Sequence, residues 1–511
     1  MNIRRVMWGL GSILVFFAAA FIVPFITAFA YDLHDGGPYS DTVRVPFTDI
    51  DSHIPRTGVV FLISGLLTAT AGLLMQYWGV EEENLRPREG YAIVGIGWFL
   101  VAVFGAIPFW FLGGLTHPVD AFFESMSGFT TTGASVMASP LDQYAPSLMM
   151  WRAFIQWVGG MGIIVLSIAL LAQLTQGGHN LMSAETPGLK MERLRPKIAQ
   201  TAKALYGLYF GFSAAVFVLL LVTIHFSGVR LGWYDATYEA MLHTFTTLAS
   251  GGFSNHDASI AYFDSFWVEL VIMVGMVATG ISFTLHYTGI RKRDLMAYLR
   301  EPEMRFFFSL IIGVSLFVSG ALWQVGEPLL DALRAGFLQS ISIITTTGYT
   351  PYVFDEWPDS ARLVLLFMFF TGGMAGSTSG AMKVIRILVL FKLLQREIRK
   401  LLHPRAVVPL RIGKTVLNDD AVKTVSVFFF TYVSLFIFAT IAMTMMGLDL
   451  VSAISGVASA LGNIGPALGS VHLSYAHVPY VGKLLLALLM WAGRLEVFTV
   501  LILFFPSTWR R

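Results

Sequence analysis

Four short glycine-containing segments are the part of this sequence best suited to bind an ion. They read Gly-Phe-Thr-Thr-Thr-Gly133-Ala-Ser, Leu-Ala-Ser-Gly-Gly252-Phe-Ser, Ile-Ile-Thr-Thr-Thr-Gly348-Tyr-Thr and Leu-Gly-Asn-Ile-Gly465-Pro-Ala. Glycine permits backbone angles that point successive carbonyls in one direction. A ring of such carbonyls can replace the hydration shell of a cation without adding net charge. The segments therefore predict a site for a dehydrated cation.

The carbonyls just before each glycine would complete that ring. We expect it to be lined by the four glycines and the two residues before each: Thr131, Thr132 and Gly133; Ser250, Gly251 and Gly252; Thr346, Thr347 and Gly348; and Asn463, Ile464 and Gly465. The alternative is that Gly and Thr simply allow membrane helices to pack closely. Packing residues belong within helices rather than at the ends of short ones, which favours the ring.

The composition excludes a soluble protein. Of 511 residues, 55% are hydrophobic and only 13% are charged, with a mean hydropathy of +0.68, whereas soluble domains carry about 25% charged residues. There is no cysteine, so thiolate metal sites and thiol catalysis are excluded. The net charge of +2 gives no signal for nucleic-acid binding, and the eleven histidines show no metal-ligand spacing. We interpret the chain as an all-α polytopic membrane protein.

A membrane-spanning helix needs about 20 largely apolar residues. Ten stretches meet this requirement, near 6–30, 57–79, 91–114, 149–173, 204–226, 266–289, 306–325, 361–390, 424–446 and 482–506. Four shorter apolar stretches, each between two spans, lie near 119–133, 235–252, 331–348 and 449–465. They are too short to cross and end in the glycine segments, which is typical of re-entrant loops that line water or are buried in protein. The pattern predicts four membrane–pore–membrane repeats around one pseudo-fourfold pore.

An acidic residue stands near the start of each short stretch, and basic residues indicate orientation. The acids, Asp120, Asp235, Asp331 and Asp449, would cap short helices and suit their dipoles. With both termini on the cytoplasmic side, the inner segments hold 26 Lys and Arg and the outer segments three, which fits the positive-inside rule. The segment 114–147 holds Asp120, Glu124 and Asp142 without Lys or Arg. These acids could attract cations to the outer mouth or simply cap helices, and Arg152 is interpreted as an interfacial anchor.

The eighth span is interrupted. It is apolar to Phe370, breaks into Thr-Gly-Gly-Met-Ala-Gly-Ser-Thr-Ser-Gly, and resumes as a basic helix through Lys383 and Arg386. Glycine destabilises a helix by about 1 kcal/mol relative to Ala, so this backbone should border the pore or be buried in protein. The alternative is a packing kink. In the last span, Arg494 would repel a cation or pair with the interrupted segment; alternatively it pairs with Glu496 or another acid, or extends to the interface.

Together these motifs resemble the TrkH/KtrB superfamily of potassium transporters. The resemblance rests on the four loops, Gln156-Trp157-Val-Gly-Gly-Met-Gly162, Gly372-Gly373-Met-Ala-Gly376-Ser-Thr-Ser-Gly380-Ala-Met-Lys383 and Gly493-Arg494-Leu-Glu496, and runs from about 90 to the end. The first two spans resemble the extra N-terminal pair of the TrkH branch. On this basis 1–85 is the N-terminal helix pair, and the pore repeats are 86–200, 201–300, 301–415 and 416–511.

The resemblance implies potassium uptake through a channel-like pore with one selectivity glycine per loop: Gly133, Gly252, Gly348 and Gly465. In plant relatives a serine at the first position accompanies sodium transport, so Gly133 favours potassium. The resemblance also implies an intramembrane gating loop below the potassium-binding filter. Its residues would be Gly372, Gly373, Gly376, Ser377, Thr378, Ser379, Gly380 and Lys383, with Arg494 beside them.

Other expectations concern partners and alternatives. The resemblance implies a homodimer in the prokaryotic cytoplasmic (inner) membrane and a cytosolic, TrkA-like nucleotide-binding regulatory subunit that docks on the basic stretch 391–414. That stretch could equally contact lipid headgroups. The chain has no nucleotide-binding motif of its own, and we expect no cofactor besides the transported K⁺. The second functional interpretation is a symporter coupled to sodium or protons. An intramembrane enzyme lacks a plausible catalytic constellation.

Overall fold

The computed structural model is almost entirely helical. It describes residues 1–32, 56–81, 86–115, 117–177, 198–229, 231–294, 296–413 and 415–509. Within these ranges the two strands form a small antiparallel hairpin, β1 (Arg411–Ile412) and β2 (Thr415–Val416), with Arg411 opposite Val416. The predicted all-α membrane fold is therefore confirmed.

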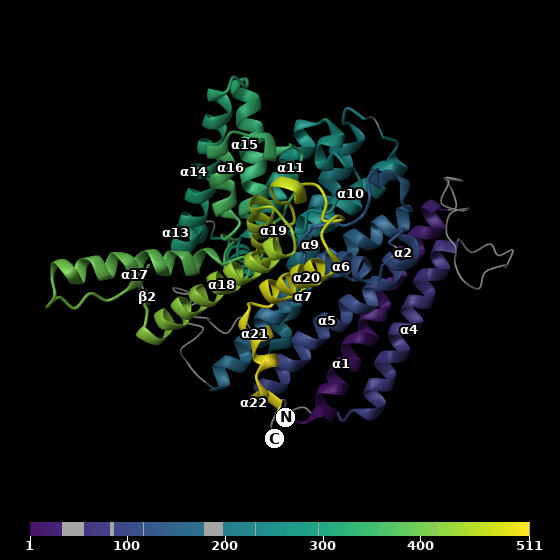
Figure 1. Ribbon diagram of the computed structural model, residues 1–511, viewed down its shortest axis with the longest axis horizontal. Helices are drawn as coiled ribbons and strands as arrows, with labels where there is room; N and C mark the ends of the chain where they lie inside the picture. Colours follow the sequence, from purple (N-terminus) through teal and green to yellow (C-terminus); the bar gives the residue numbers. More distant parts are fainter. Residues whose placement is uncertain are drawn as a thin grey trace.

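The N-terminal helices form a closely packed pair at one edge of the molecule (Figure 1). The first comprises α1 (Ile3–Ala18), η1 (Ala19–Phe21), α2 (Ile22–Thr27) and η2 (Ala28–Asp32), and it packs on α4 (Arg56–Trp78). A Cβ atom at Gly72 would lie 2.8 Å from the carbonyl oxygen of Gly11. Glycine at this crossing thus lets the two backbones approach closely, as small residues do in membrane helices.

Four further groups each place one of the predicted re-entrant helices between two other helices. The groups are α5 (Pro87–Leu112), α6 (Pro118–Phe129) and α7 (Pro146–Gly177); α9 (Ile198–His225), α10 (Trp233–Leu248) and α11 (Phe266–Gly280); α14 (Pro302–Gln324), α15 (Leu329–Ile344) and α16 (Asp359–Met368); and α18 (Asp419–Met445), α19 (Leu450–Gly462) and α20 (Tyr480–Arg494). The short helices α6, α10, α15 and α19 occupy the four stretches that the sequence predicts to be re-entrant.

Smaller elements connect these groups or follow them. They are η3 (Leu141–Gln143), η4 (Ser259–Phe263), α12 (Phe283–Lys292), α13 (Met296–Arg300), η5 (Phe354–Glu356), α17 (Val384–Leu402), η6 (Gly469–Val471), α21 (Phe498–Leu501), η7 (Ile502–Phe504) and α22 (Pro506–Trp509). Helix α17 projects away from the rest of the molecule, whereas α22 lies at the same end as the N-terminus (Figure 1).

Six helical segments in the described ranges are long and apolar enough to cross a membrane: Ile3–Asp32, Thr57–Trp78, Arg88–Leu112, Thr201–His225, Pro302–Gln324 and Asp419–Met445. The stretches predicted as spans over 266–289 and 482–506 are each a pair of helices bent at a break. Helices α11 and α12 meet at 96°, and α20 meets the segment Phe498–Phe504 at 114°. The first break arises because the carbonyls of Thr279 and Gly280 accept hydrogen bonds from Thr378 and Met374 instead of continuing the helix.

The acids at the starts of the short helices do not all act as predicted. Asp449 is a true N-cap, because its carboxylate accepts the N–H of Ser452 at 3.1 Å. Hydrogen bonds from Ser452 hold the pKa of Asp449 below its usual value. The other three, Asp120, Asp235 and Asp331, lie within the first turns of α6, α10 and α15. There their negative charges interact favourably with the positive end of the helix dipole, but their side chains do not cap the helix.

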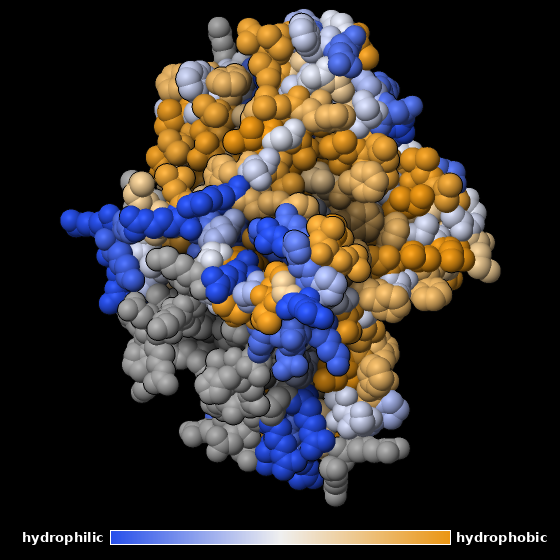
Figure 2. All heavy atoms as spheres, turned by 90° about the vertical axis from the view of Figure 1, so that its left-hand side faces the viewer, coloured by the Kyte–Doolittle hydropathy of each residue, from blue (hydrophilic) through white to orange (hydrophobic). Residues whose placement is uncertain are grey.

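The surface divides into apolar and polar zones. Figure 2 shows hydrophobic side chains over the upper part of one face and hydrophilic side chains gathered below them. The exposed apolar residues include Ile312, Leu316 and Phe317 of α14. An apolar perimeter of this kind matches a lipid environment, because most transmembrane helices expose hydrophobic side chains to the acyl chains.

Candidate functional site

The four short helices end in one repeated backbone conformation. A residue with left-handed φ follows each helix end: Thr131 (51°), Ser250 (56°), Thr346 (56°) and Asn463 (53°). The residue after each of these donates its N–H to the carbonyl five residues earlier. In the first loop Thr132 donates to Ser127, and the other three loops contain the corresponding hydrogen bond. Two residues after each left-handed residue comes a glycine, and its φ is also positive: Gly133 (84°), Gly252 (70°), Gly348 (80°) and Gly465 (103°).

This repeated conformation distinguishes between the two glycines of the second loop. Gly252 occupies the position of Gly133, Gly348 and Gly465, whereas Gly251 corresponds to Thr132. The second loop therefore differs from the first and third in having a glycine where they have threonine. The choice of Gly252 over Gly251 in the sequence agrees with this geometry.

The four loops touch one another in cyclic order. A Cβ atom at each glycine would collide with the carbonyl oxygen of the residue that precedes the next glycine. The pairs are Gly133 with Gly251, Gly252 with Thr347, Gly348 with Ile464, and Gly465 with Thr132. The fourth loop thus returns to the first, and the four loops form one closed ring. Only glycine fits at these four positions, for both steric and conformational reasons.

Side chains outside the ring hold individual loops in place. Gln156 of α7 donates to the carbonyl of Gly251 at 2.7 Å and accepts the N–H of Phe253 at 3.2 Å. Tyr475 donates to the carbonyl of Gly465 at 3.0 Å. Gln156 is fully buried, and its side-chain amide can both donate and accept a hydrogen bond.

The sequence suggested that Arg152 is an interfacial anchor, but the structure shows that it is not. Its side chain is buried and donates from Nε to Glu124 at 2.7 Å and from Nη1 to the carbonyl of Ser254 at 2.6 Å. The guanidinium lies 3.7 Å from the ring centre of Phe253. Glu124 in turn accepts the N–H of Val136. This ion pair therefore ties the segment after Gly133 to the segment after Gly252.

Two of the three acids in the outer segment 114–147 are paired with basic side chains. Glu124 is fully buried with Arg152, and Asp120 accepts a hydrogen bond from Lys483 at 2.6 Å. Asp142 is exposed. The sequence could not reveal these pairs, because Lys483 lies 363 residues from Asp120.

The interrupted segment 371–380 lies against the ends of three short helices. Thr378 Oγ1 is 2.8 Å from Ser250 Oγ, and Gly380 donates its N–H to Thr346 Oγ1 at 2.7 Å. A Cβ atom at Gly380 would lie 2.8 Å from Cβ of Asn463. Ser250, Thr346 and Asn463 are three of the four left-handed residues. The segment is thus neither a free loop nor a simple kink, since its backbone crosses beside the ring.

Backbone hydrogen bonds anchor this segment on both sides. Gly372 donates to Met382 at 2.9 Å and Val384 donates to Gly373 at 3.1 Å, which closes the segment on itself. Met374 donates to Gly280 at 2.9 Å. The buried carboxylate of Glu303 accepts the N–H of Ala375 at 2.8 Å. In the sequence, Glu303 is distinguished only as an acid at the start of a span.

Two predicted basic residues hold carbonyls of the same segment. Arg494 donates from Nη1 to Thr378 at 2.6 Å and is 2% exposed. Lys383 donates to Ser379 at 2.5 Å. Arg494 Nε and Nη2 have no hydrogen-bond partner in the described ranges. Glu496 pairs with Arg386, so the alternative of an Arg494–Glu496 pair fails, and burial excludes extension to the interface.

The fold and the ring together define a polytopic membrane protein of the transporter class, in which four similar loops surround one axis. A family model described as TrkH, cation transport protein, matches residues 58–510. The chain therefore belongs to the TrkH family, whose members are transporters and not enzymes.

Individual relatives cover most or all of the chain. It is 38% identical over 452 residues to the Trk system potassium uptake protein TrkH of Halomonas elongata, covering 88% of this chain and 91% of the relative. It is 36% identical to TrkH of Salmonella typhimurium, with complete coverage of both. The crystal structure of the potassium transporter TrkH from Vibrio parahaemolyticus superimposes with a TM-score of 0.86 at 33% identity, again with complete coverage of both chains.

Removing the buried guanidinium of Arg152, behind the ring, should destabilise the protein. In Arg152→Gln the carboxylate of Glu124 stays buried without its partner, which should lower the free energy of unfolding by about 3–5 kcal/mol. Arg362→Gln is the control, since Arg362 forms partly exposed pairs with Asp355 and Asp359, and such pairs contribute about 0–1 kcal/mol. Thermal unfolding in detergent measures both. Equal melting temperatures for the two variants would contradict the assigned role of Arg152.

Proposed function

We propose that this protein mediates potassium uptake through a gated, channel-like pore with one selectivity glycine in each repeat. The observation that carries the proposal is the cyclic contact of the four glycine loops. Backbone carbonyls arranged around one axis can replace the water shell of a monovalent cation. The relatives in Halomonas and Salmonella are named potassium uptake proteins, which supports potassium as the ion.

The short helices add an electrostatic contribution. Each of α6, α10, α15 and α19 ends at the ring, so its C-terminal, negative dipole end faces the proposed ion. The ring itself contains no charged side chain. Neutral carbonyls and helix dipoles favour a cation without binding it too tightly to leave, which conduction requires.

We propose the segment 371–380 as the gate. It contacts Ser250 and Thr346 at the ring, and Arg494 and Lys383 hold its carbonyls. A buried guanidinium beside the pathway would also repel a cation. Opening then requires Thr378 and Ser379 to leave these donors, so the hydrogen bonds set part of the barrier to opening.

The cellular setting proposed from the sequence remains a homodimer in the cytoplasmic membrane with both termini inside. Helix α17 and the β1–β2 hairpin extend beyond the helical body (Figure 1). Their basic residues include Lys392, Arg396 and Lys400. These residues could dock a cytosolic, nucleotide-binding regulatory subunit, or they could contact lipid headgroups.

The alternative is symport with sodium or protons. One observation favours it: Glu303 is a buried carboxylate in direct contact with the gate segment. Proton coupling needs a titratable group that contacts the moving part, and Glu303 satisfies that condition.

Ion flux into liposomes that contain this chain alone tests the function. Saturable potassium flux that exceeds sodium flux, follows the imposed voltage and ignores a proton gradient supports the pore. Flux that requires sodium or a proton gradient supports the symporter. Potassium flux no greater than sodium flux, both with the chain alone and after adding the regulatory subunit, contradicts the proposal.

The glycine of the third loop should be essential for selectivity. Gly348→Ala places a Cβ against the carbonyl of Ile464 at a φ of 80°, a conformation that costs about 1–2 kcal/mol for other residues. We expect the potassium-to-sodium flux ratio to fall about tenfold, since 1.4 kcal/mol corresponds to a factor of ten. Gly313→Ala in α14, where a Cβ meets nothing within 4 Å, is the matched control. An unchanged ratio in Gly348→Ala would count against the carbonyl ring.

Arg494 should restrain the gate. Arg494→Ala removes both the buried charge and the hydrogen bond to Thr378, so potassium flux should rise severalfold without a change in the apparent affinity for potassium. Arg494→Lys keeps the charge but loses the planar guanidinium, and its flux should lie between wild type and Arg494→Ala. The assignment fails if Arg494→Ala folds normally and conducts no faster than wild type.

A further inference from the structure

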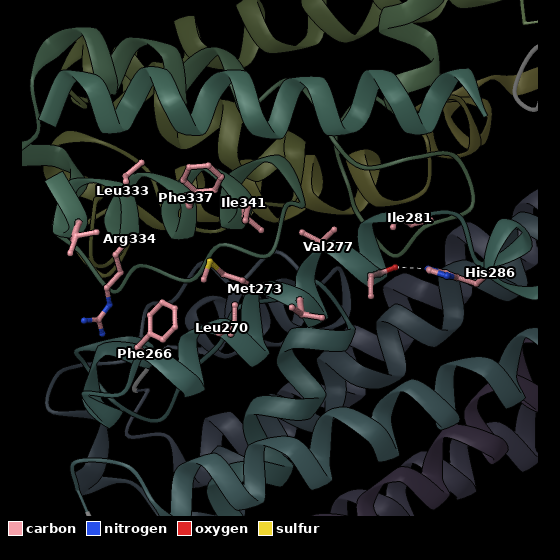
Figure 3. Close-up of a pocket in the computed structure, with 13 residues that line it drawn as sticks. Phe266, Leu270, Met273, Val277, Ile281, His286, Leu333, Arg334, Phe337 and Ile341 are labelled. Carbon is pink, nitrogen blue, oxygen red and sulfur yellow. Dashed lines mark hydrogen bonds between the residues drawn. The ribbon is translucent and has the colours of Figure 1, made fainter. Parts of the chain in front are cut away.

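An open apolar groove lies between α11 and α15 (Figure 3). Its volume is about 640 Å³. Leu270, Met273 and Val277 line one wall, and Leu333, Phe337 and Ile341 line the other. Val274 at its edge is 60% exposed and Leu330 is 79% exposed. The groove therefore opens to the outer perimeter of the helices, where a membrane protein meets lipid.

The corresponding junction between the first two groups of helices is filled by aromatic side chains. A Cβ at Gly160 would contact Ala249, the C-cap residue of α10, just as a Cβ at Gly280 would contact Thr345, the C-cap residue of α15. Gly160 of α7 and Gly280 of α11 are therefore equivalent positions.

The equivalence shows what the groove lacks. Six and three residues before Gly160 stand Phe154 and Trp157, and both pack on Phe245 of α10, at ring-centre distances of 5.5 and 5.3 Å. Six and three residues before Gly280 stand Val274 and Val277, which line the groove. Where one junction is closed by a phenylalanine and a tryptophan, the other has two valines and an open space.

We propose that this groove binds one acyl chain of a membrane phospholipid. From Phe266 to Val277 the wall of α11 is about 17 Å long at 1.5 Å per residue, close to the half-thickness of a hydrocarbon core about 30 Å across. An apolar groove of that length, open to the bilayer, suits a lipid tail and excludes water.

Arg334 provides a position for the headgroup. It lies at one end of the groove and His286 at the other (Figure 3). Arg334 donates from Nε and Nη2 to Glu269, and its side chain is 31% exposed. Guanidinium groups bind phosphate through charge-assisted hydrogen bonds. Because Glu269 offsets the charge, the site does not require an anionic lipid and suits a zwitterionic phosphatidylethanolamine.

The bound acyl chain of the lipid would support the end of α11. Val277 and Ile281 border the groove, and between them lie Thr279 and Gly280, whose carbonyls accept the N–H groups of Thr378 and Met374. A lipid tail in the groove therefore holds the point at which the segment 371–380 is attached. Only this effect on transport rests on the function proposed above; the lipid site itself does not.

Val277→Trp tests the lipid site. It gives α11 the residue that the equivalent position of α7 already has, so the side chain should fill the groove while the protein folds. Wild type, Val277→Trp and Ile312→Trp are each reconstituted with phosphatidylethanolamine and phosphatidylglycerol, and retained phospholipids are counted by native mass spectrometry. Ile312 of α14 is exposed and does not line the groove. Val274→Phe replaces Val277→Trp if the latter does not fold.

We expect Val277→Trp to retain one phospholipid fewer per chain than wild type and Ile312→Trp. Equal retention in all three overturns the site. Loss of a dimer in Val277→Trp without loss of lipid also overturns it, because the groove would then be a contact between two copies. If lipid is lost and potassium flux stays unchanged, the coupling to the gate segment is overturned. The lipid count is decisive even if the chain transports nothing alone.

Discussion

The contact between each loop glycine and the carbonyl of the next loop is the constraint on which the rest of the structure depends. Any side chain at Gly133, Gly252, Gly348 or Gly465 would push two loops apart. The loops can approach this closely only because the four short helices end in the same left-handed turn. The surrounding residues, including Gln156 and the Arg152–Glu124 pair, fix the loops from outside. Neutral backbone groups are thereby brought together, and charged groups are kept behind them.

The two basic groups that contact the segment 371–380 differ from Arg152, which is paired with the carboxylate of Glu124. Arg494 and Lys383 are buried and donate to backbone carbonyls, not to carboxylates. A charge paired with an acid would be largely neutralised, whereas a charge on a carbonyl keeps most of its field. Arg386 differs, since it pairs with Glu496 and lies 3.9 Å from the ring centre of Phe428. The proposed gate is thus held by the cations that remain electrostatically active.

The sequence predicted those parts of the site whose conformation depends on adjacent residues. The loop glycines, the short helices and the interruption after Phe370 each depend on the conformational preferences of adjacent residues, and all were visible in the sequence. The break after Gly280 was not, because it depends on hydrogen bonds between distant segments: the backbone of Gly280 is bonded to Met374. The break after Arg494, where Glu496 and Val497 have positive φ, was not visible either. Hydropathy counts apolar residues and cannot show that a helix ends because its carbonyls have found other donors. The roles of Arg152 and Glu303 were missed for the same reason.

The segment 371–380 belongs to one repeat only, although it lies beside residues from three. Four separate, identical subunits around an axis would bring four copies of such a segment to the same place, and they would exclude one another. Joining four unequal repeats in a single polypeptide removes that conflict. Covalent linkage thus permits a single segment to lie beside a nearly symmetrical ring, and each repeat can change its sequence without forcing the same change on the other three.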